Sequence, residues 1–91
     1  MKIYIILNTS KDQAILHLHQ VVEKLQGLGA QCFLDPSLQQ VVGEIPAQFL
    51  PAKHVMGEMD LLITIGGDGT IIHGAKYAIH YHLPILGINI G

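Results

Sequence analysis

The chain has 91 residues, of which 49% are apolar and only 13% are charged, against a usual charged share of about 25%. This length and composition exclude intrinsic disorder and allow one domain with a modest core. Five lysines and seven acids give a formal charge of −2 with no arginine, which argues against a nucleic-acid partner because such proteins present a basic patch.

The first third of the chain predicts a strand, a helix and a second strand. Residues 3–7 are a β-branched run that suits a strand buried on both faces. Ser10 and Gln13 have the spacing of a helix capping box, and Gly27 and Gly29 stop the helix that follows. Residues 30–34 form the second strand, which we expect to lie parallel to the first. The helix carries one apolar stripe: Ala14, Ile15, Leu18, Val21, Val22 and Leu25.

Residues 36–58 are interrupted by three prolines and two glycines, so we expect short helical turns and loops there. The regular pattern resumes with a buried strand at residues 61–65. A helix is expected to start near Thr70, and Pro84 breaks it before a last strand at residues 85–88.

The alternation of strands and helices predicts an α/β fold, a Rossmann-like open parallel sheet flanked by helices on both faces. We treat residues 1–91 as one nucleotide-binding domain. No covering helix follows the last strand, so we expect a truncated N-terminal domain of a longer protein. The alternative is a complete small α/β domain that oligomerises to hide its edges.

The residues with the clearest chemistry form the run Gly66, Gly67, Asp68, Gly69 and Thr70, between a strand and a helix. Ligands of open α/β sheets bind at this end of a strand, where glycine backbone and a helix N-terminus suit phosphate. A carboxylate beside a phosphate is repulsive unless it takes a proton or a cation. Asp68 is therefore a candidate general base or magnesium ligand. The alternative is that Asp68 only caps the helix and the glycines only make a tight turn.

Residues 60–70, together with residues 84–91, resemble the N-terminal domain of the NAD kinases, and the opening strand with its Asn8 turn is also similar. The Gly-Gly-Asp-Gly-Thr motif is shared with diacylglycerol-type lipid kinases and, with serine last, with phosphofructokinases. Lipid kinases usually continue with Glu and Asn on the helix, which residues 71–76 lack. Phosphofructokinases carry a Gly-Gly-Asp turn after their first strand, where this chain has Asn8, Thr9, Ser10 and Lys11.

The resemblance implies magnesium-dependent transfer of the ATP γ-phosphate to the 2′-hydroxyl on the adenosine ribose of NAD, which makes NADP. Asp68 matches the catalytic aspartate and would act as general base. The glycines and Thr70 would hold phosphate, and Asn89 would lie at the nucleotide crevice. Asn8, Lys11 and His73 are weaker site candidates, Lys11 for a phosphate contact and His73 for a substrate contact. Polyphosphate also fits a cradle of backbone amides as phosphoryl donor.

Members of the family continue with a β-rich domain that grips NAD, so we expect the 91-residue chain to be inactive alone. The apolar excess predicts a hidden interface, either with that domain or between the subunits of a homo-oligomer. Two other functions stay open: a lipid or sugar kinase with the same motif, and a non-catalytic nucleotide-binding module.

The isolated cysteine and histidines predict no metal centre made by protein side chains. Cys32 is the single cysteine and suits a buried position in a strand. His17 and His19 point in different directions on a helix, and His80 and His82 lack a third ligand. No apolar run reaches the roughly 18 residues of a membrane span, and the N-terminus has no signal-peptide pattern, so we expect a cytoplasmic protein with no membrane partner.

Overall fold

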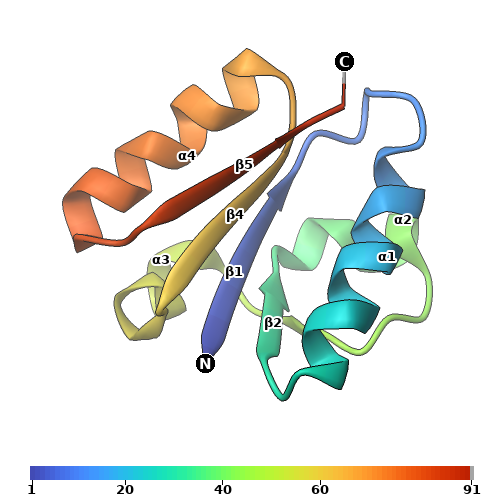
Figure 1. The fold of residues 1–91 in the computed structure, drawn as a ribbon, viewed down its shortest axis with the longest axis horizontal. Coiled ribbons are helices and arrows are strands. Elements are labelled where there is room, and N and C mark those ends of the chain that lie inside the picture. Colours follow the sequence, from blue (N-terminus) through green and yellow to red (C-terminus); the bar gives the residue numbers. More distant parts are fainter. Residues whose placement is uncertain (91) are drawn as a thin grey trace.

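The computed structural model describes residues 1–90 and has an α/β Rossmann-like fold. Gly91, the last residue of the stretch that resembles the NAD kinases, lies outside the described residues. Every strand runs parallel to its neighbours, in the order β3-β2-β1-β4-β5 (Figure 1). The strands are β1 (Lys2–Leu7), β2 (Gln31–Leu34), β3 (Gln48–Phe49), β4 (Leu61–Gly66) and β5 (Ile85–Asn89). The α-helices are α1 (Ala14–Gly27), α2 (Gln39–Val42), α3 (Ala52–Val55) and α4 (Asp68–Tyr81).

Helix α1 follows its predicted stripe but not its predicted cap. Leu18 and Val22 are fully buried on the sheet, and the helix ends at Gly27, as expected. The capping-box prediction is wrong, because the Ser10 amide and hydroxyl both donate to Asn8 Oδ1, at 3.0 and 2.7 Å. An Asx turn takes the hydroxyl that the cap would have used. The residue at the N-cap position is Gln13, in the left-handed region with φ 61° and without a side-chain cap.

The segment between β2 and β4 contains the expected short helices, with 3₁₀ turns at Pro36–Leu38 and Met56–Glu58. The sequence prediction missed β3, which pairs with the end of β2 at Phe33↔Gln48 and Leu34↔Phe49. A two-residue strand shows no periodicity, so no pattern could have identified it.

Apolar side chains fill both faces of the sheet. Helices α1 and α2 cover one face, and α3, the second 3₁₀ turn and α4 cover the other. Cys32 is buried, as predicted, and so are Met56 and Met59, which fill the core beside α4. The α1 face is formed by Ile3, Ile5, Leu18, Val22, Cys32, Leu34, Val42, Ile63 and Ile65. The α4 face is formed by Tyr4, Phe33, Met56, Met59, Leu62 and Ala78.

Helix α4 begins at Asp68, two residues before the predicted start, and packs closely on β4 and β5. A Cβ added at Gly74 would lie 2.5 Å from Thr64 Cγ2 and 3.2 Å from Ile85 Cδ1. Since real Cβ atoms do not approach so closely, the missing side chain sets the distance between helix and sheet.

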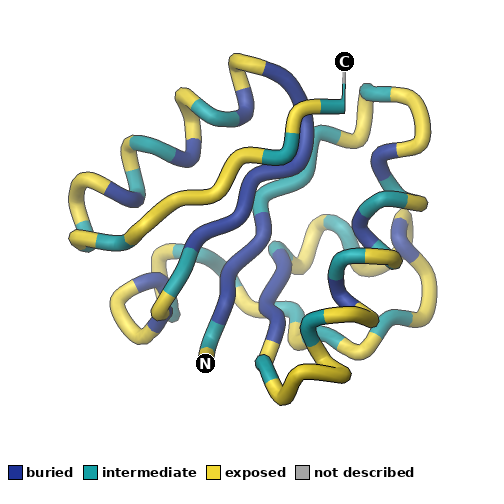
Figure 2. The backbone as a smooth tube through the Cα atoms, in the orientation of Figure 1, coloured by how far each residue is buried: buried dark blue, intermediate teal, exposed yellow. Residues whose placement is uncertain are grey.

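Apolar side chains also remain exposed beside this contact. The edge strand β5 is open along most of its length (Figure 2), and Leu86 is 52% exposed there. Ile72 and Ile79 protrude from α4 at 63% and 76% exposure. These residues are the candidates for the hidden interface that the composition predicts. Within residues 1–90, no helix combines the length and apolar character that crossing a membrane requires.

Substituting Gly74 by alanine should destabilise the fold, because the new methyl group would push α4 away from β4. We expect a loss of about 1–3 kcal/mol in the free energy of unfolding, measured by urea denaturation. Gly69→Ala is the matched control, because nothing lies within 4 Å of a Cβ at Gly69. The better helix propensity of alanine should make this second variant neutral, or more stable by up to about 1 kcal/mol. Equal effects at the two positions would contradict the packing argument.

Tyr4 should make stability fall at alkaline pH. Its buried hydroxyl donates to the Leu50 carbonyl at 2.8 Å. Burial, with the charge of Asp35 and the nearby Tyr77 adding to it, raises the pKa of Tyr4 well above its ordinary value of about 10. The folded state therefore favours the neutral phenol, and this stability is present below about pH 10 and lost as the pH rises further.

Tyr4→Phe should lose about 1 kcal/mol at pH 8, because the hydrogen bond is gone. It should then lose less stability than the native chain between pH 9 and pH 11. Urea denaturation at several pH values measures both effects. If the free energies of unfolding of the two proteins fall equally over that range, Tyr4 is not the titrating group.

Candidate functional site

The carboxyl ends of β1 and β4 form the point where the strand order of the sheet reverses. β1 and β4 are neighbours, yet the loop after β1 leads to α1 on one face and the loop after β4 leads to α4 on the other (Figure 1). In open α/β sheets ligands bind in a crevice at such a point, where successive loops lead to opposite faces, so the site is expected here.

The glycine-rich turn leaves the start of α4 without a side-chain cap. Gly66 ends β4, Gly67 is the N-cap residue, and Asp68 is the first helical residue and is exposed. The alternative that Asp68 caps the helix is wrong, because glycine occupies that position and no side chain accepts a hydrogen bond from the first turn. The amides of the first turn and the positive end of the helix dipole thus suit an anion.

Gly66 lies close to residues of both loops. A Cβ added there would lie 2.9 Å from Asn8 Cβ and 3.0 Å from Thr70 Cβ. The Asn8 amide donates to the Ile65 carbonyl at 2.9 Å, which extends the pairing of β1 and β4 by one bond. Asn8 and the buried Thr70 therefore both lie against the same glycine.

Asn89 joins this group from the other neighbouring strand. It pairs with Gly66 in the register of β4 and β5, and the amide of Ile90 donates to the Gly66 carbonyl at 3.0 Å. Three adjacent strand ends thus bring Asn8, Gly66 and Asn89 together at one edge, beside Asp68.

Of the three weaker candidates, Asn8 belongs to this group, and Lys11 and His73 lie at its border. Lys11 is in the turn after β1, where its amide donates to the Asn8 carbonyl at 3.4 Å. His73 is one helical turn beyond Thr70 and is exposed, with its ring edge-on to Tyr77 at a centroid distance of 5.6 Å. His73 therefore faces a neighbouring feature rather than the glycine turn itself.

That feature is a slot of about 170 Å³ between α4 and the segment that follows β2. Asp35 lines it, and the sequence patterns above did not single out this residue. A carboxylate directly after a buried parallel strand was the available signal. The slot is lined by Tyr4, Ile5, Ile6, Leu7, Asp35, Ser37, Leu38, Ala52, His73 and Tyr77.

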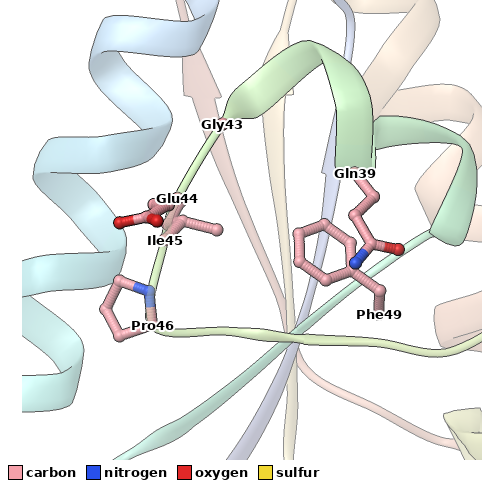
Figure 3. A pocket seen from close by; sticks show the side chains of 6 residues that line it. All are labelled: Gln39, Gly43, Glu44, Ile45, Pro46 and Phe49. Carbon is pink, nitrogen blue, oxygen red and sulfur yellow. The ribbon is translucent and has the colours of Figure 1, made fainter.

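A wider hollow of about 770 Å³ lies beside the edge strand β3, and Figure 3 shows its lining. Its walls come from α2, Phe49 of β3 and the loop between them, and they include no residue of the glycine turn. It is lined by Gln39, Gly43, Glu44, Ile45, Pro46 and Phe49. The candidate site is therefore assigned to the glycine turn because of the residues there, although the hollow beside β3 is larger. Across residues 1–90, no group of three or more His, Cys, Asp or Glu side chains is arranged to hold a metal ion.

Comparison with known proteins gives the family of the chain. Residues 3–91 match the family model described as the ATP-NAD kinase N-terminal domain. A protein named NAD kinase from Symbiobacterium thermophilum is 33% identical over 90 residues, which are 99% of this chain and 31% of that protein. Another, from Methanopyrus kandleri, is 43% identical over 83 residues, which are 91% of this chain and 29% of that protein.

A third relative named NAD kinase, from Ruminiclostridium cellulolyticum, is 37% identical over 93 residues, which cover 99% of this chain and 31% of that protein. The chain thus spans less than a third of the length of the curated relatives it matches. The family model, in contrast, covers nearly the whole chain. This chain therefore belongs to the ATP-NAD kinase N-terminal domain family.

Proposed function

We propose that the protein containing this chain phosphorylates the 2′-hydroxyl on the adenosine ribose of NAD, with ATP as donor, and so makes NADP. The observation that carries this proposal is the exposed carboxylate of Asp68 at an uncapped helix N-terminus, at the carboxyl end of β4 beside β1. Family membership and the names of the relatives support NAD as the acceptor.

The glycine turn acts as the phosphate cradle in this proposal. Gly66, Gly67, Gly69 and the Thr70 hydroxyl let phosphate oxygens approach the first-turn amides of α4. Because the chain has no arginine, Mg²⁺ bound to the nucleotide would neutralise much of the phosphate charge. Mg²⁺ is usually held by one or two carboxylates plus substrate phosphates, and the exposed carboxylate of Asp68 fits that donor set.

Asp68 serves as the general base. Its carboxylate takes the proton of the ribose 2′-hydroxyl while that oxygen forms a bond to the γ-phosphorus. The bond between the γ-phosphorus and the β–γ bridging oxygen breaks, and ADP leaves with that oxygen. A positioned base and in-line alignment supply most of what phosphoryl transfer needs from a protein.

Four further residues have supporting roles in this proposal. Asn8 and Asn89 hold nucleotide hydroxyl or phosphate groups from the strand ends on either side of Gly66. Lys11 contributes positive charge from the turn after β1, and His73 contacts the donor along α4. Inorganic polyphosphate remains a second candidate donor, because a cradle of backbone amides recognises phosphate and not adenine.

The rest of the protein supplies the NAD-binding half. Residues 1–91 form the nucleotide-binding domain, and a β-rich domain would complete the site and cover apolar side chains such as Leu86. The support is the length of the curated relatives, of which this chain covers about 31%. A homo-oligomer is a second way to cover those side chains.

Asp68→Asn should abolish most of the activity of the whole protein, because the amide cannot accept the hydroxyl proton. We expect kcat for NADP formation to fall by about 10² to 10⁴. Asp60→Asn is the matched control: it removes the same charge at the opposite edge of the sheet, where Asp60 accepts from the Lys2 amide, and should keep normal turnover. Full activity in the Asp68 variant would refute the general-base role.

The 91-residue chain alone should form no NADP above a blank, because the NAD-binding half is absent. The measurement is a coupled NADP assay with ATP, Mg²⁺ and NAD, run beside the whole protein. NADP formation by the short chain would contradict the proposal that the rest of the protein supplies the NAD-binding half. A folded whole protein that phosphorylates a lipid or a sugar, and not NAD, would contradict the proposed activity.

A further inference from the structure

The slot beside α4 has an apolar interior and a polar rim. Its floor is formed by β1, including the half-buried Ile6, and one end is closed by Ala52 of α3. Tyr77 lines it from α4, and Asp35 lines it from the segment after β2. At about 170 Å³ it holds roughly five or six water molecules, and it is smaller than the roughly 300 Å³ of a pocket that encloses a whole ligand. It therefore suits one ring of a larger molecule.

The slot lies within reach of the glycine turn. Thr70, His73 and Tyr77 are three and four residues apart, so they share one side of α4, and His73 lies about 5 Å along the helix from Thr70. Across the sheet, β1 separates β4 from β2, so Asp35 follows a strand about 10 Å from β4. A nucleotide with its phosphates on the glycine turn spans such a distance.

Asp35 lines the slot, and its hydrogen bonds within the described residues use one of its two carboxylate oxygens. The Ser37 amide donates to its Oδ2 at 2.9 Å, and the Ser37 hydroxyl donates to the same oxygen. Among residues 1–90, Oδ1 receives no hydrogen bond and no lysine pairs with this half-buried carboxylate. A partly buried carboxylate is stabilised when its free oxygen accepts a hydrogen bond. A sugar hydroxyl is a neutral group that can donate one.

We propose that this slot binds the ribose of the nucleotide that donates the phosphoryl group, with Asp35 accepting hydrogen bonds from its hydroxyls. The apolar floor and Tyr77 pack against the sugar ring. This inference rests on the proposed function. The reacting adenosine ribose of NAD must lie at Asp68, so the slot is assigned to the donor. The nicotinamide ribose of NAD is the other sugar of the same chemistry, and the NAD probe below separates the two sources.

Asp35→Asn in the whole protein tests the assignment. Calorimetry with Mg²⁺ compares three probes: the ATP analogue with NH in place of the β–γ bridging oxygen, inorganic triphosphate, and NAD. We expect the variant to bind the ATP analogue about 10- to 100-fold more weakly, as for a lost hydrogen bond to a charged group, and the other two probes normally. Asparagine still accepts from the Ser37 amide, so the local turn is preserved.

Two more variants complete the experiment. Asp60→Asn is the matched control, since Asp60 also accepts a backbone amide but lies at the opposite edge of the sheet, and it should bind all three probes normally. Ala52→Leu fills the slot without a change of charge and should weaken the ATP analogue alone. Melting temperatures show whether each variant is folded.

Each other outcome overturns the assignment. If both Asp35→Asn and Ala52→Leu bind the ATP analogue as the unmodified protein does, the ribose does not bind in the slot. Equal weakening of the analogue and triphosphate makes Asp35 part of the phosphate site. Selective weakening of NAD assigns the slot to the acceptor. Failure of the unmodified protein to make NADP would refute the proposed function instead, and the binding comparison does not depend on turnover.

Discussion

The pairing of β1 with β4 is the constraint on which the rest of this structure depends. The two strands align from Ile3↔Leu61 to Leu7↔Ile65, and the Asn8 amide adds a bond to the Ile65 carbonyl. Because β2 already occupies the other side of β1, the chain must return from the β3 edge to reach this position. That return places α1 and α4 on opposite faces, and the crevice between their loops is the geometric result.

Two glycines convert this pairing into a site with fixed distances. Gly74 lets α4 approach β4 closely, so the helix cannot slide outward without losing contact with Thr64. Gly66 lets both Thr70 and Asn8 approach the end of β4. The N-terminus of α4 is thereby held at the level of the strand ends, where its free amides are useful to an anion. A side chain at either glycine would first displace α4 relative to the strand ends, and any effect on phosphoryl transfer would follow from that displacement.

Sequence patterns predicted the core positions that depend on periodic burial. They failed where neighbouring polar groups compete for the same hydrogen bond. Leu18 and Val22 were identified as core because burial on one helical face leaves a regular spacing. The Ser10 cap was wrong because Asn8, two residues earlier, offers its own acceptor to the same hydroxyl. The glycine turn was recognised because its residues are contiguous. The slot was not, because its walls come from four separate segments and Asp35 alone shows no pattern.

Two carboxylates beside an anion site need a physical reason, since each repels phosphate. A helix N-terminus supplies only about half a unit of positive charge, and the chain has five lysines and no arginine. In the proposed reaction neither acid contacts phosphate directly. Asp68 takes the proton of a hydroxyl that reacts, and Asp35 accepts from hydroxyls that do not react. With Mg²⁺ carried by the nucleotide, both acids also disfavour nucleotide that arrives without its cation. The same charges that oppose free phosphate thus select the form of the donor that is ready for transfer.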